Sequence, residues 1–155
     1  MAAATAWTMH DKAKEYIGDG TIDLDGDTFK LVLYLSTSDI ATTSVNGYAA
    51  ATNEVATNFG YTQAGVTLTS PTWTESSGTV TFDATDMTDA WTASGGSIVC
   101  RFAAIYDDTV AAPVAKPILC HTLLDSAPAD ITVTAGNTLS ITFPAGGIFA
   151  VTSTP

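Results

Sequence analysis

The segment TFKLVLYLS, residues 28–36, decides the fold class of this chain because its side chains alternate in character. One face of an extended strand would carry four large apolar side chains, those of Phe29, Leu31, Leu33 and Leu35. The opposite face would carry Tyr34 among polar and smaller residues, so we expect Tyr34 to point outward. A slip of one residue would expose all four apolar side chains, and the pattern therefore predicts a strand with a well-specified register.

Similar short runs of Thr and apolar residues recur as far as residue 149, separated by turns of Gly, Asn, Asp, Ser or Pro. Further strands are predicted at residues 66–69, 72–75, 79–84, 98–106, 118–124, 131–134, 138–143 and 148–151. We expect a polar crossover at 86–93 and a closing hairpin at 131–143. Arg101 should find an acidic partner or surface at an interface, because an unpaired buried cation is costly. Many short strands with regular turns predict an all-β domain, an antiparallel β-sandwich or jelly roll.

The N-terminal region predicts a short helix over residues 8–17, capped by Thr8 and stopped by Gly18. We therefore expect an N-terminal arm and helix at residues 1–18 and a β-sandwich domain at residues 19–155. The helix would either close the open end of the sandwich or project toward a partner. Trp7 would act as a staple or as an anchor on another subunit. The tail at 152–155 is expected to be frayed or tied to a neighbour.

Residues 37–62 lack apolar alternation and predict a long connection. Long loops without regular structure are often functional, so this segment is the first candidate for partner contact. The alternative is a loop that only wraps its own sandwich. The candidate interface residues are Trp7, Tyr16, Ile17, Tyr34, Tyr48 and Tyr61.

Composition restricts the partners of the chain. Its 155 residues include 5 Lys plus Arg and 16 Asp plus Glu, for a net charge of −11. Nucleic-acid affinity depends on cationic side chains, so duplex DNA and anionic membranes are not expected partners. No apolar run reaches the roughly 20 residues that span a bilayer. The first residues lack the apolar core of a secretory signal, and we expect synthesis in the cytosol.

Side chains for catalysis are scarce, with two His and two Cys. Cys100 and Cys120 are expected to be buried thiols, although adjacent strands would also permit a disulfide. Cys120 and His121 would point to opposite faces of a strand, which argues against a catalytic pair. The chain contains no catalytic or phosphate-binding motif, and we expect neither enzymatic activity nor a cofactor.

Two aspartate groups are candidates for chemistry. Asp19, Asp23, Asp25 and Asp27 offer oxygen ligands for calcium, but their spacing departs from the EF-hand pattern and suits a turn equally well. Asp83, Asp86 and Asp89 would supply the carboxylates of a glycosidase, yet aspartates near turns usually accept backbone hydrogen bonds. No metal ligand set is predicted.

Several segments together resemble a known class of protein. They are KEYIGDGTIDL (14–24), DTFKL (27–31), NEVA (53–56), GYT (60–62), VTFDA (80–84), WTASGGSI (91–98), IYDD (105–108), GNTL (136–139) and GIF (147–149). The chain resembles small structural proteins of tailed-bacteriophage virions, of the head decoration or cement kind. These motifs are turn and strand patterns, and the family supplies no catalytic residue to transfer.

The resemblance implies a non-enzymatic β-sandwich that binds the outside of a capsid shell and stiffens the joints between capsomers. Its partners would be the major capsid protein and neighbouring virion proteins, and it would form a trimer or dimer. It would be made in the bacterial cytoplasm and reside on the capsid exterior. The alternative is a fibre, collar or tail component that recognises a host receptor or glycan.

Overall fold

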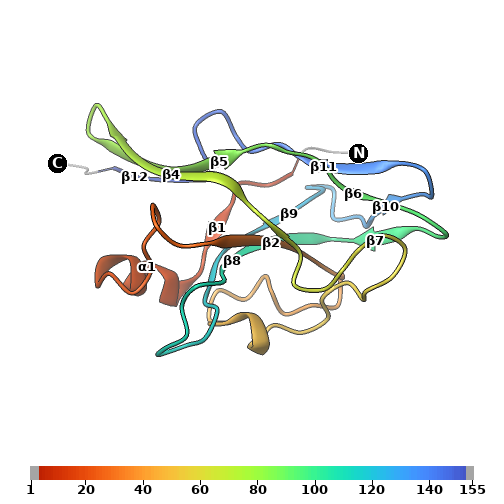
Figure 1. Ribbon diagram of the computed structural model, residues 1–155, viewed down its shortest axis with the longest axis horizontal. Helices are drawn as coiled ribbons and strands as arrows, with labels where there is room; N and C mark the ends of the chain where they lie inside the picture. The colour runs from red at the N-terminus through yellow and green to blue at the C-terminus, as the bar shows by residue number, and fades with distance from the viewer. Residues whose placement is uncertain (1–3, 153–155) are drawn as a thin grey trace.

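The computed structural model describes residues 4–152 as a mostly β structure with one helix, which confirms the expected all-β class (Figure 1). The elements are β1 (Thr8–Met9), α1 (Asp11–Gly18), β2 (Phe29–Tyr34), the 3₁₀ turn η1 (Tyr48–Ala50), β3 (Val66–Thr67), β4 (Thr69–Ser76), β5 (Thr79–Thr85), β6 (Met87–Thr92), β7 (Ile98–Cys100), β8 (Phe102–Asp107), β9 (Ile118–Leu123), β10 (Ile131–Val133), β11 (Thr138–Ile141) and β12 (Phe149–Thr152). Most of the expected tail, residues 153–155, lies outside the described residues.

The strands form two layers of antiparallel sheet. One layer contains the five-stranded sheet β1-β9-β8-β2-β3, with the pair β10-β7 next to it along the chain. The other contains the three-stranded sheet β12-β5-β4 and the pair β11-β6. Figure 1 shows β4, β5, β11 and β12 above, and β2, β7 and β8 below. Jelly-roll connectivity stays a prediction.

The burial of side chains in the central strand β2 confirms which of its faces was predicted to lie in the core. Phe29, Leu31 and Leu33 are fully buried in the main core between the layers, and Leu35 packs against it partly buried. The ring of Phe29 meets that of Phe82 from β5 edge to face, with centroids 5.2 Å apart. Burying these apolar faces holds the two layers together.

The outer face of β2 is covered, and the expectation that Tyr34 points into solvent is wrong. Tyr34 is 0% exposed, because residues 37–62 pass over β2 and β8 and bury a second apolar cluster. That cluster consists of Val32, Tyr34, Ile40, Ala104, Tyr106 and Ile118. The long connection therefore does wrap its own sandwich, as the alternative interpretation predicted.

The helix is shorter than predicted. Thr8 and Met9 pair with β9 instead of starting the helix, since Thr8 lies opposite His121 and the His10 N–H donates to the Leu119 carbonyl. The helix begins at Asp11 after His10, whose side chain does not cap it. Tyr16 is buried with Ala13 in the main core, so the helix packs against the sandwich.

Three strand predictions require correction. Residues 87–92 form β6 rather than a polar crossover, and β6 pairs with β11. The expected hairpin at 131–143 does not form, because β10 pairs with β7. Ala93 explains this division: its N–H donates to the Asn137 carbonyl and its carbonyl accepts from the Gly136 N–H, which fixes the turn before β11 to the end of β6. The expected strand at 98–106 is two strands that meet at Arg101.

Arg101 has the acidic partner that its position predicted. Its Nε donates to Oδ1 of Asp130 at 2.8 Å. The Arg101 backbone also continues the sheet, since its N–H donates to the Tyr34 carbonyl and its carbonyl accepts from Leu124 N–H. The charge of this cation is therefore compensated.

Candidate functional site

The two histidines contact each other. Nε2 of His10 lies 3.0 Å from Nδ1 of His121, and Nδ1 of His10 lies 2.7 Å from the Val45 carbonyl oxygen. Both rings are buried. Cys120 belongs to the main core on the other face of β9, so it does not face His121, as strand alternation predicts.

Both cysteines are free and buried, which confirms the expectation of buried thiols. Burial raises the pKa of Cys100 to about 12 and that of Cys120 well above its usual value. The reactive form of cysteine is the thiolate, and these side chains remain thiols at neutral pH. Their role is to fill the core.

The aspartates before β2 form a turn, which was one of the two predictions made for this group. Asp19 Oδ1 accepts from the Thr21 N–H at 2.9 Å, and Asp23 Oδ1 accepts from the N–H groups of Asp25 and Gly26, each at 3.1 Å. Asp27 Oδ2 accepts from the Asp23 N–H at 2.8 Å. Residues 4–152 contain no group of three or more His, Cys, Asp or Glu side chains placed to hold a metal ion.

The aspartates around β6 also bind backbone. Asp86 Oδ1 accepts from the Phe143 N–H at 2.8 Å, and Asp83 Oδ1 accepts from the Ala84 N–H at 2.9 Å. The Asp89 N–H donates to the Ser140 hydroxyl at 2.9 Å, and Asp89 lies in β6 opposite β11. These contacts support the structural interpretation of the Asp83 and Asp86 side chains, whereas the contact of Asp89 is made by its backbone.

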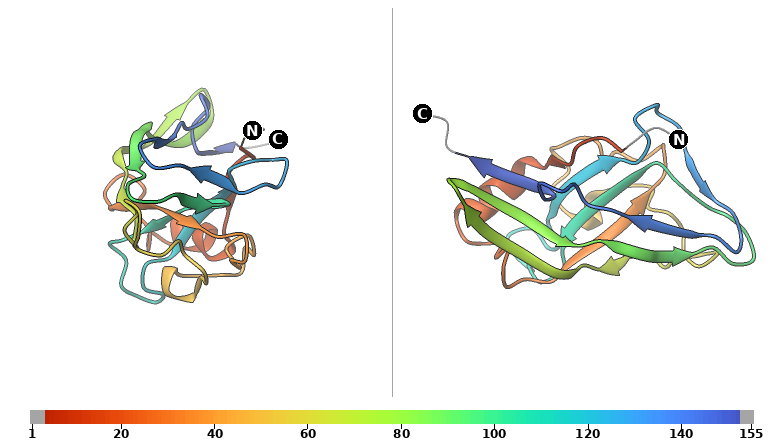
Figure 2. Two further views of the ribbon diagram at one scale, coloured as in Figure 1. Left: turned by 90° about the vertical axis from the view of Figure 1, so that its right-hand side faces the viewer. Right: turned by 90° about the horizontal axis from the view of Figure 1, so that it is seen from above.

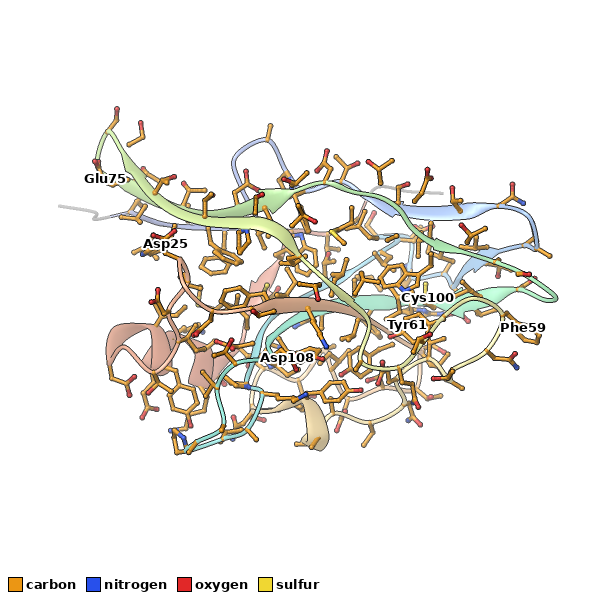
Figure 3. All side chains as sticks on the ribbon, in the orientation of Figure 1. Asp25, Phe59, Tyr61, Glu75, Cys100 and Asp108 are labelled. Carbon is orange, nitrogen blue, oxygen red and sulfur yellow. The ribbon has the colours of Figure 1, made fainter. Side chains whose placement is uncertain are left out.

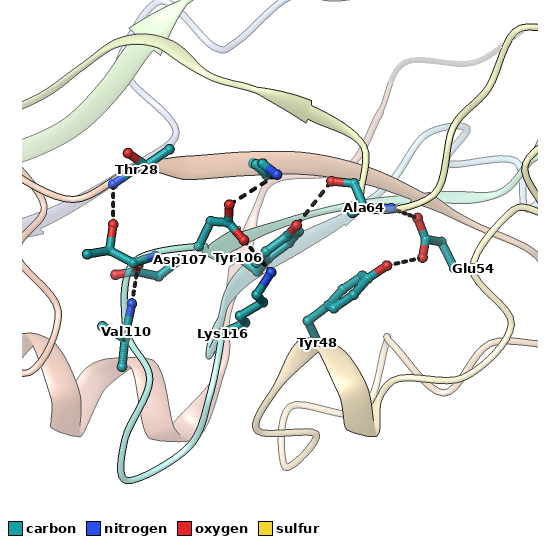
Figure 4. A network of polar contacts seen from close by, with 11 residues as sticks. Thr28, Tyr48, Glu54, Ala64, Tyr106, Asp107, Val110 and Lys116 are labelled. Atoms are coloured by element: carbon teal, nitrogen blue, oxygen red, sulfur yellow. Dashed lines mark hydrogen bonds and ion pairs between the residues drawn. The ribbon is translucent and has the colours of Figure 1, made fainter.

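Glu54 is the centre of a polar network that holds the long connection against β2 (Figure 4). Its carboxylate accepts from the hydroxyls of Tyr48 at 2.5 Å and Tyr61 at 2.7 Å, and from the Ala64 N–H at 2.8 Å. The Tyr61 hydroxyl in turn accepts from the Leu33 N–H at 3.1 Å. Hydrogen bonds to a charged acceptor are stronger than neutral ones, so this network stabilises the loop.

A second polar cluster closes the turn after β8. Asp108 forms ion pairs with Lys30 at 3.0 Å and Lys116 at 2.6 Å (Figure 4). Oδ1 of the fully buried Asp107 accepts from the Thr109 and Val110 N–H groups, and its Oδ2 has no donor among the described residues. Burial and the neighbouring Asp27 raise the pKa of Asp107 to about 6.

The six candidate interface residues do not form one surface. Tyr16, Tyr34 and Tyr61 are at most 4% exposed, which corrects the expectation that they are available to a partner. Tyr48 is half-buried, because its ring stacks on Tyr106 with centroids 4.7 Å apart. Ile17 lines a separate hollow beside Leu24 and Trp73. Trp7 is partly buried and lines another hollow.

Trp7 belongs to an N-terminal segment, residues 4–10, that lies along the outer edge of β9. The Thr5 N–H donates to the Leu123 carbonyl at 2.9 Å, and the Thr122 hydroxyl donates to the Thr5 carbonyl at 2.7 Å. The Trp7 ring reaches Phe143, with centroids 5.9 Å apart. Because Phe143 follows β11, Trp7 joins the two layers where they diverge.

We call this side of the sandwich, where β9 and β10 face β11, the open side. In the right-hand view of Figure 2, β11 and β12 run along one edge of their layer and β4 runs along the other. Within residues 4–152, β10 pairs only with β7 and β11 only with β6, so each strand has one edge without a strand partner.

Two hollows lie along the open side and share Ile131 and Leu139. The first has a volume of about 140 Å³ and is mostly apolar, with Trp7, Leu124 and Ile141 in its wall. The second has a volume of about 460 Å³ and follows β10 and the start of β11. Together they form a groove beside two strand edges, which is the candidate functional site.

A further apolar feature lies at the end of the molecule opposite the helix. Phe59 is 39% exposed and has a positive φ of 51° in the turn after Asn58 (Figure 3). Its ring occupies the space that a side chain at Gly96 would need. Phe59 was not among the predicted interface residues, although the sequence Asn58-Phe59-Gly60 indicated the turn.

Comparisons with protein-family models, with curated proteins and with solved structures found no match for this chain. Among residues 4–152, no helix is long and apolar enough to cross a membrane.

Proposed function

We propose that this chain is a non-enzymatic structural protein of a tailed-bacteriophage virion, a decoration or cement protein on the outer capsid shell. The observation that carries the proposal is the open side, where a groove runs beside the edges of β10 and β11 that have no partner among the described strands. Such edges accept an extended segment from another chain, which adds as a further strand. The resemblance described above supplies the virion context.

The contacts of the polar side chains support a binding role over a catalytic one. The histidines bind each other, the cysteines remain thiols in the core, and the aspartates near turns accept backbone hydrogen bonds. These contacts serve the fold.

The partner contact is expected to centre on the shared wall of the two hollows. Trp7 and Leu139 offer partly buried apolar surface there, and hydroxyl-bearing residues surround them. Interfaces commonly place an aromatic anchor inside a polar rim. The groove is therefore suited to an extended segment of the capsid protein that inserts one apolar side chain.

The experiment compares binding of two variants to capsid shells purified without this chain. Thr132→Arg with Thr138→Arg adds two bulky side chains at exposed positions beside the groove, where neither hydroxyl has a hydrogen bond among the described residues. Thr72→Arg with Thr74→Arg makes the same change on β4, at the opposite edge of its layer.

We expect the groove variant to lose at least tenfold in affinity by co-sedimentation, because strand addition requires an unobstructed edge. The β4 variant should bind as the wild type does. Equal binding of both variants would contradict the assignment of the open side, and failure of the wild type to bind any shell would contradict the virion role.

A further inference from the structure

We propose that His10 and His121 form an acid-sensitive latch that holds the N-terminal segment on β9 at neutral pH and releases it in acid. The latch goes beyond the proposed function and does not depend on it. Its basis is the position of the two rings, 111 residues apart in the chain and in direct contact in the fold.

Three segments meet at the pair. His10 ends the N-terminal segment, Val45 belongs to the long connection, and His121 lies in β9. The rings meet edge to face, with centroids 5.1 Å apart and an angle of 88° between planes. His10 is 0% and His121 8% exposed. A change in either ring is therefore transmitted to all three segments.

The hydrogen-bond partners determine where each proton lies. The Val45 carbonyl only accepts, so Nδ1 of His10 must carry a hydrogen and donate it. Nε2 of neutral His10 is then an acceptor, and Nδ1 of His121 must donate to it. Both rings are therefore neutral with the hydrogen on Nδ1, while Nε2 of His121 has no hydrogen-bond partner among the described residues.

This arrangement accepts one proton and excludes the second. A proton on Nε2 of His121 leaves both hydrogen bonds intact and costs only the burial of a charge. A proton on Nε2 of His10 would point at the N–H of His121, so two donors and two positive charges would meet at 3.0 Å. The doubly protonated pair must separate.

Few other charges face the pair. Asp11, whose carboxylate accepts from Thr43 and Lys14, favours a charged His10, and Lys14 opposes it. Residues 40–47 carry no charged side chain, β9 carries none besides His121, and Ala104 lies opposite His121 on β8. Asp11 therefore favours a charge on His10, but no carboxylate of residues 4–152 acts on His121 to compensate a second imidazolium group.

The direction of the pH effect follows from the same burial. Burial lowers the pKa of His10, and burial followed by repulsion from His10 lowers the pKa of His121 to about 4. Released rings would titrate near their ordinary value of about 6.5. The latch is therefore fully effective above about pH 6.5 and weakens as pH falls toward 4, because the open form binds more protons.

For each additional proton that the open form binds, the equilibrium constant for opening rises about tenfold with every unit by which the pH falls. One extra proton predicts an increase of about a hundredfold between pH 6 and pH 4. Opening would free Thr5, Trp7 and Thr8 from β9 and uncover the apolar hollow that Trp7 lines. The folded chain would then present different surfaces in neutral and acidic solution.

Hydrogen exchange tests the latch on the full chain. The informative amides are those of Thr5, His10 and Asp11, which donate to Leu123, Leu119 and Thr43. The control is His10→Asn with His121→Asn, which removes both titrating rings while the amide introduced at position 10 takes over the donation to Val45. Comparing the two proteins at each pH cancels the intrinsic pH dependence of exchange.

We expect the opening of these amides to rise about a hundredfold from pH 6 to pH 4 in the wild type relative to the control, while β8 amides stay protected. An equal acid response in both proteins would overturn the latch. Simultaneous loss of protection in β8 would also overturn it, because the event would then be global unfolding.

A second measurement needs no variant. Nitrogen NMR of the wild-type imidazoles at neutral pH should show hydrogen on Nδ1 of both rings. Hydrogen on Nε2 of either ring in the folded protein would contradict the proton assignment and with it the latch.

Discussion

At the scale of single residues, the buried histidines and the buried Asp107 give the stability of this fold opposite pH dependences. The buried histidines favour neutral solution, because acid would charge them. Asp107 behaves in the other direction, since its raised pKa means that the folded state holds a proton that the unfolded state releases. A hydrogen on Asp107 Oδ2 also relieves the contact with Asp27, because two ionised carboxylates repel.

Asp107 provides the prediction at this scale. Its contribution to stability is complete below its unfolded pKa near 3.8 and is lost as pH rises through about 6. Asp107→Asn keeps an acceptor for the Thr109 and Val110 N–H groups and replaces the proton with an N–H toward Asp27. When the pH rises from about 4.5 to about 8, the free energy of unfolding of the variant should increase by about 2 kcal/mol relative to that of the wild type. Urea denaturation at both pH values measures this, and a pH-independent difference would refute the assignment.

At the scale of elements, close packing of turns against strands decides which strands pair. The turn after Asn58 rests on the end of β6, where the Ser94 N–H donates to the Phe59 carbonyl. Gly60 makes this approach possible, because a Cβ there would lie 2.0 Å from the Thr92 carbonyl oxygen. Gly136 has a similar positive φ, and a Cβ there would meet open space.

Alanine substitutions at the two glycines distinguish the cost of steric overlap from the cost of backbone strain. Gly136→Ala should cost about 1 kcal/mol, which is the conformational penalty of a side chain at positive φ. Gly60→Ala carries the same penalty and also forces the turn away from β6, so it should cost at least about 3 kcal/mol in the free energy of unfolding. Chemical denaturation of the two variants side by side gives the comparison. Equal losses would show that the turn does not rest on β6 as described.

The same elements show what could be predicted from sequence. The core face of β2 was predictable, because its alternation is strong and local. β6 was overlooked because polar residues alternate with Met87 and Trp91, and the 131–143 hairpin was mispredicted because Ala93, a distant residue, binds its turn. Burial of Tyr34 depends on a loop that covers it, and burial by distant chain segments leaves no local pattern. The open side was not predictable for the same reason, since free strand edges are a property of topology.

At the scale of the whole molecule, the chain combines one packed core with a groove beside the edges of β10 and β11 that stay unpaired within residues 4–152. The main core includes residues of both layers and of α1, so the sandwich and its helix form one packed body. In the proposed virion role, the net charge of −11 would make neighbouring copies repel one another and would disfavour contact with packaged DNA. These properties suit a component that is present in many copies and acts by contact.

Copy number separates the proposed decoration or cement role from the alternative of a fibre, collar or tail component. A cement protein occupies repeated sites over the shell, whereas a receptor-binding component occupies few positions. The central claim is therefore tested most directly by quantifying this chain against the major capsid protein in purified virions. The account predicts near-stoichiometric amounts. A few to tens of copies per particle, or none, would contradict it.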